Sequence, residues 1–482
     1  MRLVTSVICA AAALLTASCS EPPGSIDAAS ARLGAAQVNA VSFSGAGRFY
    51  NFGQPATPGE AWPAFELISY EALIGYESPA VHVKYTRKPV INPNRGPQPD
   101  PVEQRTEILM AAGTAWFIPG QPVAVNQNWP ASVEERTAEI IATPHGFLKE
   151  AKASNAEVTP AEGGGSTVSF TSGRLKFSGR INVNNEVERV ATVLDMPGTG
   201  DTPVEFVFSD YKDFSGFVFP GRIQRNQGGF PVMELTVASA AKNPQIAITV
   251  PDSAKAPLAP PSIAVEQLAK GVYLLKSSHN SLAIEQTDHL VVVEAPLSER
   301  HAEALISRIK DIIPGKPIRY VVNSHVHFDH SGGLRTFVDE GATVITHEVN
   351  KPYYEKIWTN PRTLSPDRLS KSGKSAMFET VGDKHVITDG QRPIEMHLMA
   401  GSGHADGFLM VYLPNERIIS QADAYSPRPP GAGPVQTVNP LSKNFYDNIE
   451  RLKLDVATIA PLHGRAGTMA DLRRDIGMTE AK

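Results

Sequence analysis

The sequence predicts a mixed α/β protein in which a mainly antiparallel β domain precedes an α/β domain. Its 482 residues exceed what one ordinary hydrophobic core holds, so we expect two domains. The hydrophobic pattern also changes along the chain. Period-two alternation dominates residues 39–250, whereas strand-like and helix-like segments alternate over residues 263–482. A proline-rich segment at 251–262 separates the two patterns and predicts an extended linker.

The region 39–250 has the pattern of one large antiparallel sheet accompanied by a helix or two. Turn signals such as Asn226-Gln227-Gly228-Gly229 separate its strand-like segments, and a helix is expected over residues 132–142. Its alternating segments are Val41-Ser42-Phe43-Ser44, Val81-His82-Val83-Lys84-Tyr85, Thr167-Val168-Ser169-Phe170, Glu205-Phe206-Val207-Phe208 and Val232-Met233-Glu234-Leu235-Thr236-Val237. No catalytic constellation is evident in this region of the sequence.

The region from 263 onward alternates strands with helices. Residues 289–294 predict a buried strand, and Ser298 begins a helix whose apolar residues recur at spacings of three and four. Residues 318–323 predict the next strand. Residues 351–378 form a polar excursion that we expect to fold into helices over the functional site, and 444–453 predict a late helix.

The first residues predict export. Residues 1–19 combine Arg2 with an apolar stretch that is about half of the roughly 20 residues a membrane-spanning helix needs, as in a signal peptide. Thr16-Ala17-Ser18-Cys19 resembles a bacterial lipobox, in which the cysteine carries the lipid. Residues 20–38 are small and polar and predict a tether. We therefore expect a bacterial cell-envelope location, either as a lipoprotein whose only membrane contact is the anchor on Cys19 or as a cleaved periplasmic protein.

Composition excludes several classes of function. A formal net charge of −5 and an isoelectric point near 6.2 argue against nucleic-acid binding, so the expected partner is a small-molecule substrate. The two cysteines, Cys9 and Cys19, both lie in the targeting segment. A cysteine nucleophile or a cysteine metal ligand is therefore excluded from the mature domain.

The run His325-Val326-His327-Phe328-Asp329-His330 is the strongest functional signal. Imidazole and carboxylate groups are good ligands for zinc and related metals, and such a density of them is costly to bury without a metal. In extended chain, His325 and His327 point to the same side and can bind one ion. Asp329 and His330 follow at a turn where a helix begins. They are placed for a second ion or for the open side of the first.

Further ligands are expected at the ends of later strands. His404 lies in a glycine-rich turn between strand-like runs, Asp423 ends the buried run 417–422, and His463 follows Ile459-Ala460-Pro461-Leu462. Small residues flank each of them, so each side chain is free to turn into a cleft.

This order and spacing resemble the metallo-β-lactamase superfamily over about residues 263–475. The resemblance implies an αββα sandwich for the C-terminal domain and two Zn²⁺ ions per chain. It assigns His325, His327 and His404 to the first ion. It assigns Asp329, His330 and His463 to the second ion, with Asp423 bridging both. It also implies that His279, in the turn Ser278-His279-Asn280, faces the cleft.

The resemblance implies a hydrolase that uses a metal-bridging hydroxide to cleave an ester, lactone, amide or related bond. Asp329 is expected to orient this hydroxide in addition to binding metal. Tyr425 is expected to donate to an oxyanion, with packing as its alternative role. Arg428 is expected either to bind a substrate carboxylate or to remain an exposed loop arginine. Asp423 favours the esterase, lactonase, thioesterase and phosphodiesterase branches, because two-zinc β-lactamases usually lack a bridging carboxylate at its place, and several have cysteine or serine there.

Three alternatives remain beside this reading. One is a β-lactamase proper. A second is a metal-dependent oxidoreductase of the sulfur dioxygenase type, which uses a single iron; the full set of ligands for a second ion argues against it. A third is an envelope ligand-binding protein, in which the N-terminal sheet binds a ligand, pairs with a copy of itself or only covers the hydrolase.

Overall fold

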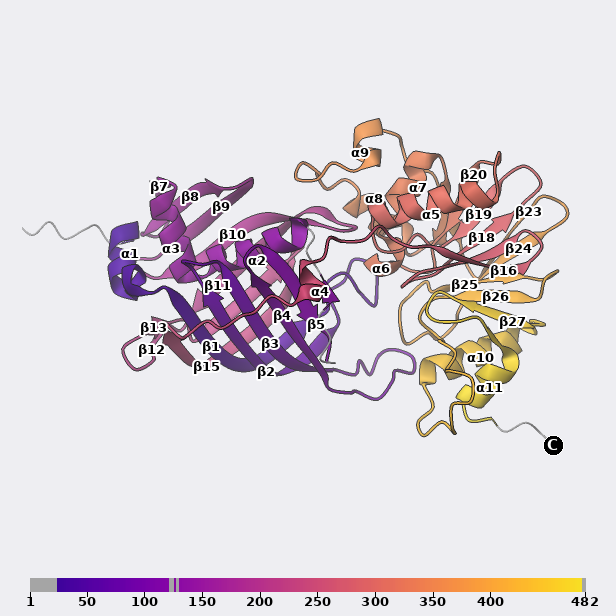
Figure 1. The fold of residues 1–482 in the computed structure, drawn as a ribbon, viewed down its shortest axis with the longest axis horizontal. Helices are drawn as coiled ribbons and strands as arrows, with labels where there is room; N and C mark the ends of the chain where they lie inside the picture. Colours follow the sequence, from indigo (N-terminus) through magenta and orange to yellow (C-terminus); the bar gives the residue numbers. More distant parts are fainter. Residues whose placement is uncertain (1–23, 121–124, 127–129, 479–482) are drawn as a thin grey trace, which may run out of the picture.

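The computed structural model describes residues 24–120, 125–126 and 130–478, which form two parts placed side by side along the long axis of the molecule (Figure 1). Residues 1–19, the expected signal peptide with Cys19, lie outside the described residues. No helix among the described residues is long and apolar enough to cross a bilayer.

The N-terminal part is built on one 13-stranded sheet, in which every neighbouring pair of strands is antiparallel. Its order is β6-β5-β4-β3-β2-β1-β15-β14-β11-β10-β9-β8-β7. The strands are β1 (Ala40–Tyr50), β2 (Ala64–Gly75), β3 (Ala80–Pro89), β4 (Gln104–Ala111), β5 (Thr114–Ile118), β6 (Val125–Asn126), β7 (Glu157–Pro160), β8 (Ser166–Ser172), β9 (Leu175–Ile181), β10 (Val187–Met196), β11 (Gly200–Ser209), β14 (Arg222–Gln227) and β15 (Phe230–Lys242). A small hairpin is formed by β12 (Lys212–Asp213) and β13 (Val218–Phe219). The expected antiparallel sheet is therefore confirmed.

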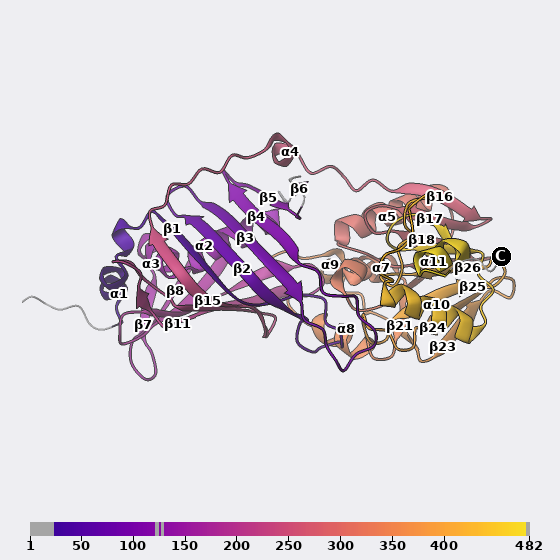
Figure 2. The same cartoon turned by 90° about the horizontal axis from the view of Figure 1, so that it is seen from below.

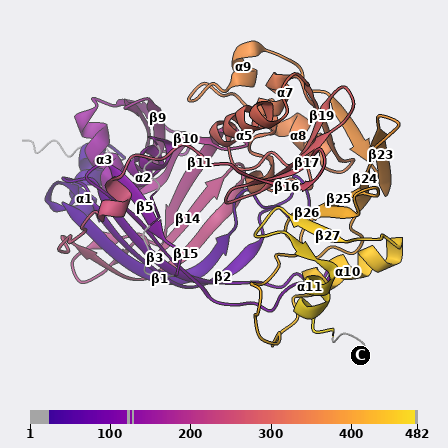
Figure 3. The same ribbon diagram turned by 45° about the vertical axis from the view of Figure 1, so that its right-hand side comes forward.

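Helices α2 (Pro130–Ala142) and α3 (Pro144–Ala153) pack on one face of this sheet (Figure 3). The first matches the expected helix, and the second follows after a single residue. Thr143 starts α3, because its hydroxyl accepts from the Gly146 amide at 3.1 Å and a proline fills the first helical position. Phe147 and Leu148 then enter the common core with the sheet.

The expected tether at 20–38 is wrong from Ile26 onward. Residues Ile26–Leu33 form α1, followed by a short 3₁₀ helix at Ala35–Gln37. Ser25 caps the N-terminus of α1 and Gly34, at φ 64°, ends it. Ala29 and Leu33, four residues apart on one helical face, are buried in the domain core. The folded domain therefore begins earlier than the polar composition suggested.

The linker is largely extended, as expected, and it runs along the outside of the N-terminal sheet (Figure 2). One helical turn, α4 (Asp252–Lys255), interrupts it. Ala254 in this turn is buried in a small cluster with Leu109 and Trp116, which fastens the linker to the sheet.

The C-terminal part contains two sheets. The 7-stranded sheet has the order β16 (Ala264–Ala269), β17 (Val272–Lys276), β18 (Ser281–Glu285), β19 (Leu290–Val293), β20 (Ile318–Val322), β21 (Thr343–His347) and β22 (Phe378–Val381). The 6-stranded sheet has the order β23 (Lys384–Thr388), β24 (Pro393–Leu398), β25 (Leu409–Leu413), β26 (Ile418–Gln421), β27 (Thr458–Pro461) and β28 (Gly467–Thr468). The helices are α5 (Glu299–Ile312), α6 (Phe328–Ser331), α7 (Leu334–Glu340), α8 (Lys351–Ile357), α9 (Arg368–Ser372), α10 (Pro440–Leu452) and α11 (Met469–Asp475).

Three hydrophobic layers show that this part is an αββα sandwich. The middle layer joins the two sheets, for example Val291 with Met396. One outer layer packs α5, α7, α8 and α9 on the first sheet, where Leu305 and Ile309 of α5 are fully buried. The other packs α10 and α11 on the second sheet, with Phe445 of α10 buried. The expected fold class is confirmed, and the excursion at 351–378 forms the helices α8 and α9.

The two parts meet around the end of β20. The loop between β1 and β2 approaches α6 so closely that a Cβ on Gly53 would lie 2.1 Å from the Phe328 ring. Asp406 accepts hydrogen bonds from Thr57 at 2.7 Å and from Arg95 at 3.0 Å. Asp201 of the N-terminal sheet accepts from the Thr363 hydroxyl at 2.6 Å. The N-terminal part therefore lies directly against the predicted functional site.

Candidate metal centre

Strand ends bring the predicted ligands together. The run 325–330 follows β20 and enters α6, Asp423 follows β26, and His463 follows β27. The Leu409 amide donates to the Ser324 carbonyl at 2.9 Å and ties the two sheets together beside the run. A Cβ on Gly332 would lie 2.1 Å from the Leu297 carbonyl oxygen, so glycine is required where the turn after α6 packs against the preceding loop.

One cluster consists of His325, His327, His404 and Asp423. Its ligand atoms all lie within 4.8 Å of one another. The Nε2 atoms of His404 and His325 are 3.3 Å apart, and both face the Asp423 carboxylate. Converging imidazole nitrogens and a carboxylate form a donor set that suits a divalent transition metal.

The second cluster consists of His279, Asp329, His330 and His463, whose ligand atoms also lie within 4.8 Å of one another. His279 was not among the ligands that the motif assigned, but it does face the cleft as expected. The buried Asn280 donates to the carbonyls of Pro461 at 3.0 Å and Gly464 at 2.9 Å. These bonds hold the turn against the loop of His463, so that the His279 and His463 ring centroids lie 4.6 Å apart.

Asp423 of the first cluster also contacts histidines of the second. Its Oδ2 is 3.2 Å from His325 Nε2, 3.0 Å from His404 Nε2 and 3.1 Å from His330 Nε2. Its Oδ1 is 2.8 Å from His463 Nε2. One carboxylate thus reaches histidines of both groups, which is the position of a ligand shared by two ions.

The electrostatics of the site fit bound cations. Burial lowers the pKa of His325 to about 4, so its ring is neutral at neutral pH and offers a lone pair. Burial acts to raise the pKa of Asp423, but the neighbouring His330 and His404 hold it well below its usual range. For His330, burial is outweighed by Asp423 and Glu294, which raise its pKa well above its ordinary value. Carboxylates on both sides of the His330 ring favour a positive charge there. Either a proton or a bound metal ion can supply that charge.

Glu294 orients the ligand His325 through Ser324. This fully buried carboxylate accepts from the Ser324 hydroxyl at 2.5 Å and the Ser324 amide at 3.1 Å. Ser324 Oγ in turn lies 2.8 Å from His325 Nδ1. Because the Ser324 hydroxyl donates its hydrogen bond to Glu294, its Oγ can accept from His325 Nδ1–H. His325 Nε2 is then free to bind a metal. The sequence predicted no role for Glu294. Its position directly after the buried strand β19 was the one feature that could have marked it.

The N-terminal domain contributes two further contacts to predicted ligands. The Pro55 carbonyl lies 3.2 Å from His327 Nε2, so it can accept that N–H and leave Nδ1 free. The Gln54 side-chain amide donates to Asp329 Oδ1 at 3.0 Å. No sequence signal marked either residue, because both lie in a loop of a different domain.

The Tyr425 hydroxyl does not point at the metal centre, where a donor to an oxyanion would be needed. Its hydroxyl donates to Asp475 Oδ2 at 2.9 Å, and the side chain is buried beside Phe445. Burial and Asp475 raise the pKa of Tyr425 far above its ordinary value, so it holds its proton. The contacts therefore describe the alternative packing role.

A pocket opens next to Asp423 and contains Arg428 among its lining residues. Arg428 Nη1 is buried and has no hydrogen-bond partner within the described part of the chain. The Arg428 main chain is fixed, because its amide donates to Asp475 at 3.0 Å and its carbonyl accepts from Arg465 at 2.7 Å. The backbone of Arg428 is therefore fixed at the wall of the pocket that Asp423 also lines, and its guanidinium retains an unused donor.

Comparisons with known proteins agree with this architecture. The family model of the metallo-beta-lactamase superfamily matches residues 275–463. The 2,4-dinitroanisole O-demethylase subunit alpha of Nocardioides sp. (strain JS1661) is 24% identical over 200 residues, covering 40% of this chain and 54% of that protein. The chain thus spans about half the length of this curated relative.

Two solved structures cover similar shares of the chain. The metallo-beta-lactamase from Pontibacter korlensis is 17% identical and covers 46% of this chain and 100% of its own, with a TM-score of 0.34. The DIM-1 metallo-beta-lactamase is 20% identical and covers 45% of this chain and 97% of its own, also with a TM-score of 0.34. From the family match and the αββα fold, we conclude that residues 275–463 of this chain belong to the metallo-β-lactamase superfamily.

Proposed function

We propose that this protein is an exported, zinc-dependent hydrolase that binds two ions per chain. The observation that carries the proposal is the position of Asp423, whose two oxygens reach histidines of both clusters. When bound, two zinc ions supply an activated water at neutral pH and polarise the bond under attack. His325, His327 and His404 would hold one ion, Asp329, His330 and His463 the other, and Asp423 both.

The protein groups around this centre orient it and shield one side. Asp329 accepts from Gln54 through Oδ1 and lies 3.5 Å from His279 Nε2 through Oδ2. These contacts fix the direction of a carboxylate that can accept a proton during hydrolysis. His279 stands beside it as a further proton carrier or as an additional ligand. Gly53 packs closely on Phe328, so the N-terminal domain covers this side of α6.

The pocket lined by Asp423 and Arg428 is the proposed substrate-binding site. Arg428 lines this pocket, and a guanidinium there favours a small molecule with a carboxylate or another oxygen-rich group. Cleavage of an ester, lactone or amide is the favoured reaction class. No protein nucleophile is needed for any of these bonds.

A second candidate reaction is cleavage of an aryl methyl ether. The observation behind it is the match to the α subunit of an enzyme named for O-demethylation of 2,4-dinitroanisole. The same metal centre would serve both reactions, so the substrates tested must include this ether.

The test is a substrate panel with the mature, zinc-loaded protein: generic esters, lactones, amides, phosphodiesters, a β-lactam and 2,4-dinitroanisole. Turnover of at least one class is expected, and it should vanish in His327→Ala and Asp423→Ala. His385→Ala is the matched control, since this ring lies on β23 outside both clusters. Turnover that survives in both site variants would contradict the assignment.

Export is a separate part of the proposal. Loss of radiolabelled palmitate incorporation in Cys19→Ala is expected for a lipoprotein. A mature N-terminus within the first residues after the signal peptide, without lipid, would support the cleaved periplasmic form instead. Retention of Met1 in cell-grown protein would contradict export altogether.

A further inference from the structure

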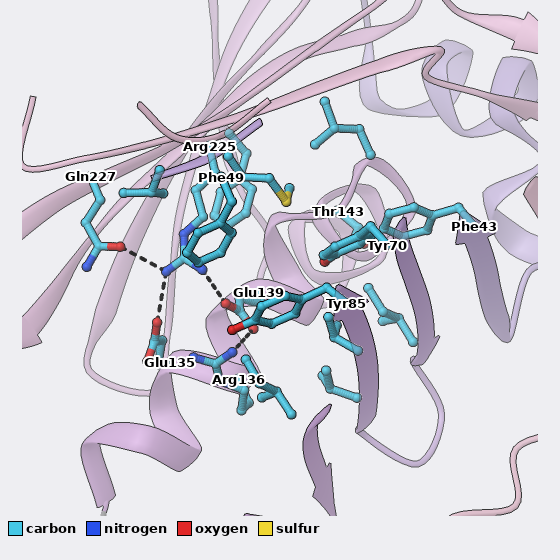
Figure 4. Close-up of a pocket in the computed structure, with 18 of the residues that line it drawn as sticks. Phe43, Phe49, Tyr70, Tyr85, Glu135, Arg136, Glu139, Thr143, Arg225 and Gln227 are labelled. Atoms are coloured by element: carbon cyan, nitrogen blue, oxygen red, sulfur yellow. Dashed lines mark hydrogen bonds and ion pairs between the residues drawn. The ribbon is translucent and has the colours of Figure 1, made fainter. Parts of the chain in front are cut away.

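A second, separate cavity lies inside the N-terminal domain, between the sheet and helix α2 (Figure 4). Its volume is about 300 Å³. Protein cores contain few voids larger than a water molecule, whose share of liquid volume is about 30 Å³. A space of this size is at the lower end of the range of small-molecule sites, roughly 300–1,000 Å³. Its size therefore suits a small-molecule ligand.

Aromatic and aliphatic side chains form most of the walls. Phe49 and Tyr85 stack with their ring centroids 5.3 Å apart, and Phe43 and Tyr70 with theirs 6.0 Å apart. Each pair joins strands next to or near each other in the sheet, so aromatic rings from several strands line this side of the cavity. Val83 lies on the same strand as Tyr85 and also lines the cavity. Most of the ligand must therefore be apolar.

One side of the cavity carries charged groups that neutralise one another. Arg225 contacts Glu135 at 2.9 Å and Glu139 at 2.5 Å. Arg136 contacts the same two carboxylates at 2.7 and 2.8 Å. The two guanidinium groups balance the two carboxylates, so a charged ligand of either sign would leave a buried charge without a partner. This pairing favours an uncharged ligand.

Two hydroxyls remain for a polar group on the ligand. Tyr70 and Tyr85 line the cavity and point into the space between the strands and α2 (Figure 4). Other tyrosine hydroxyls of this domain are paired, as in Tyr76 with Thr143 and Tyr50 with Glu234. In the described residues, the hydroxyls of Tyr70 and Tyr85 have no such partner. They can each exchange a hydrogen bond with one uncharged group.

We propose that this cavity binds an uncharged, lipid-like molecule. Its hydrocarbon part lies between the aromatic walls, and its single hydroxyl or carbonyl group meets Tyr70 and Tyr85. This site lies in the N-terminal domain and does not depend on the reaction carried out at the metal centre.

The test uses the purified mature full chain and the uncharged fluorophore N-phenyl-1-naphthylamine. Dye fluorescence is expected to rise on binding and to fall when 1-decanol displaces the dye. Decanoate has the same chain length but a negative charge, so it should compete at least about tenfold less well. Absence of dye binding, or equal competition by decanoate, would overturn the proposal.

Variants locate the binding in the cavity. Val83→Trp fills the space and should weaken dye binding by about tenfold or more, whereas Ile68→Trp, on an exposed position of β2, should not. Circular dichroism and thermal melting check that both variants fold. If Val83→Trp fails to fold, the volume-conserving double variant Tyr70→Phe with Tyr85→Phe decides the matter. It should weaken 1-decanol severalfold relative to the dye, and an unchanged ratio would contradict the assigned hydrogen bonds.

Discussion

Gln54 and Asp329 are 275 positions apart in sequence, yet the Gln54 side-chain amide donates to the Asp329 carboxylate at 3.0 Å. With the Pro55 carbonyl at His327, this contact makes the N-terminal domain part of the surroundings of the metal centre. The domain that carries the ligands therefore does not complete their environment by itself.

Removing the Gln54 amide should weaken metal binding. Partners that orient metal ligands typically contribute about 10–100-fold to metal affinity or activity, so Gln54→Ala is expected to lower zinc affinity by about tenfold. Competition against a chromophoric chelator measures this directly. Gln37→Ala, an exposed glutamine of the same domain, is the control and should not change the affinity. Equal zinc affinity in both variants would contradict the role given to Gln54.

Replacing Glu294 should affect both stability and metal binding. Its carboxylate accepts from Ser324 and from the Asn323 side chain at 3.0 Å, all within the buried interior. Glu294→Ala leaves these donors without an acceptor, at a cost of about 3 kcal/mol in the free energy of unfolding. It also releases Ser324 from orienting His325. Urea unfolding and zinc titration test the two effects, with the exposed Glu303→Ala on α5 as control. A variant with wild-type values in both measurements would exclude this support role.

Tyr425→Phe should separate packing from catalysis. Loss of the bond to Asp475 is expected to lower the free energy of unfolding by about 1 kcal/mol and to leave kcat unchanged. Tyr446→Phe, a partly buried tyrosine of the same layer, is the comparison. A large drop in kcat with unchanged stability would instead return Tyr425 to the role of an oxyanion donor.

His145 should make the N-terminal domain sensitive to acid. Burial lowers its pKa from 6.5 to about 4, and its Nε2–H donates to the Leu33 carbonyl at 3.1 Å. Below pH 6.5 the unfolded chain takes up a proton that the folded protein refuses until about pH 4. Stability is therefore complete above pH 6.5 and falls as the pH drops towards 4, by up to about 3 kcal/mol from this group.

The measurement is urea unfolding at pH 7.5, 5.5 and 4.5 for the wild type and for His145→Gln, which keeps a donor to Leu33. The difference between the two proteins cancels the titration of all other groups. The wild type should lose more stability than the variant over this range. Parallel curves would show that His145 does not titrate as described.

The histidine-rich run and the later strand-end ligands were predictable, because a local motif and strand ends are visible in sequence. His325 and His330 are neighbours along the chain, and His463 is placed by the parallel pairing of β26 with β27. Gln54 was not predictable, because its contact with Asp329 depends on how two domains pack. The sequence left Tyr425 between an oxyanion donor and a packing residue, since only the position of Asp475 on α11 decides where its hydroxyl points. The helix α1 was missed because short, small residues gave a weak hydrophobic pattern.

The central claim is a site for two metal ions shared through Asp423. Elemental analysis by inductively coupled plasma mass spectrometry tests it most directly, on mature protein purified without added metal. We expect about two zinc ions per chain in the wild type and at most one in Asp423→Ala, with Asp447→Ala on α10 as the control that retains both. One iron per chain, or folded wild-type protein that takes up no more than one ion when zinc is supplied, would contradict the account.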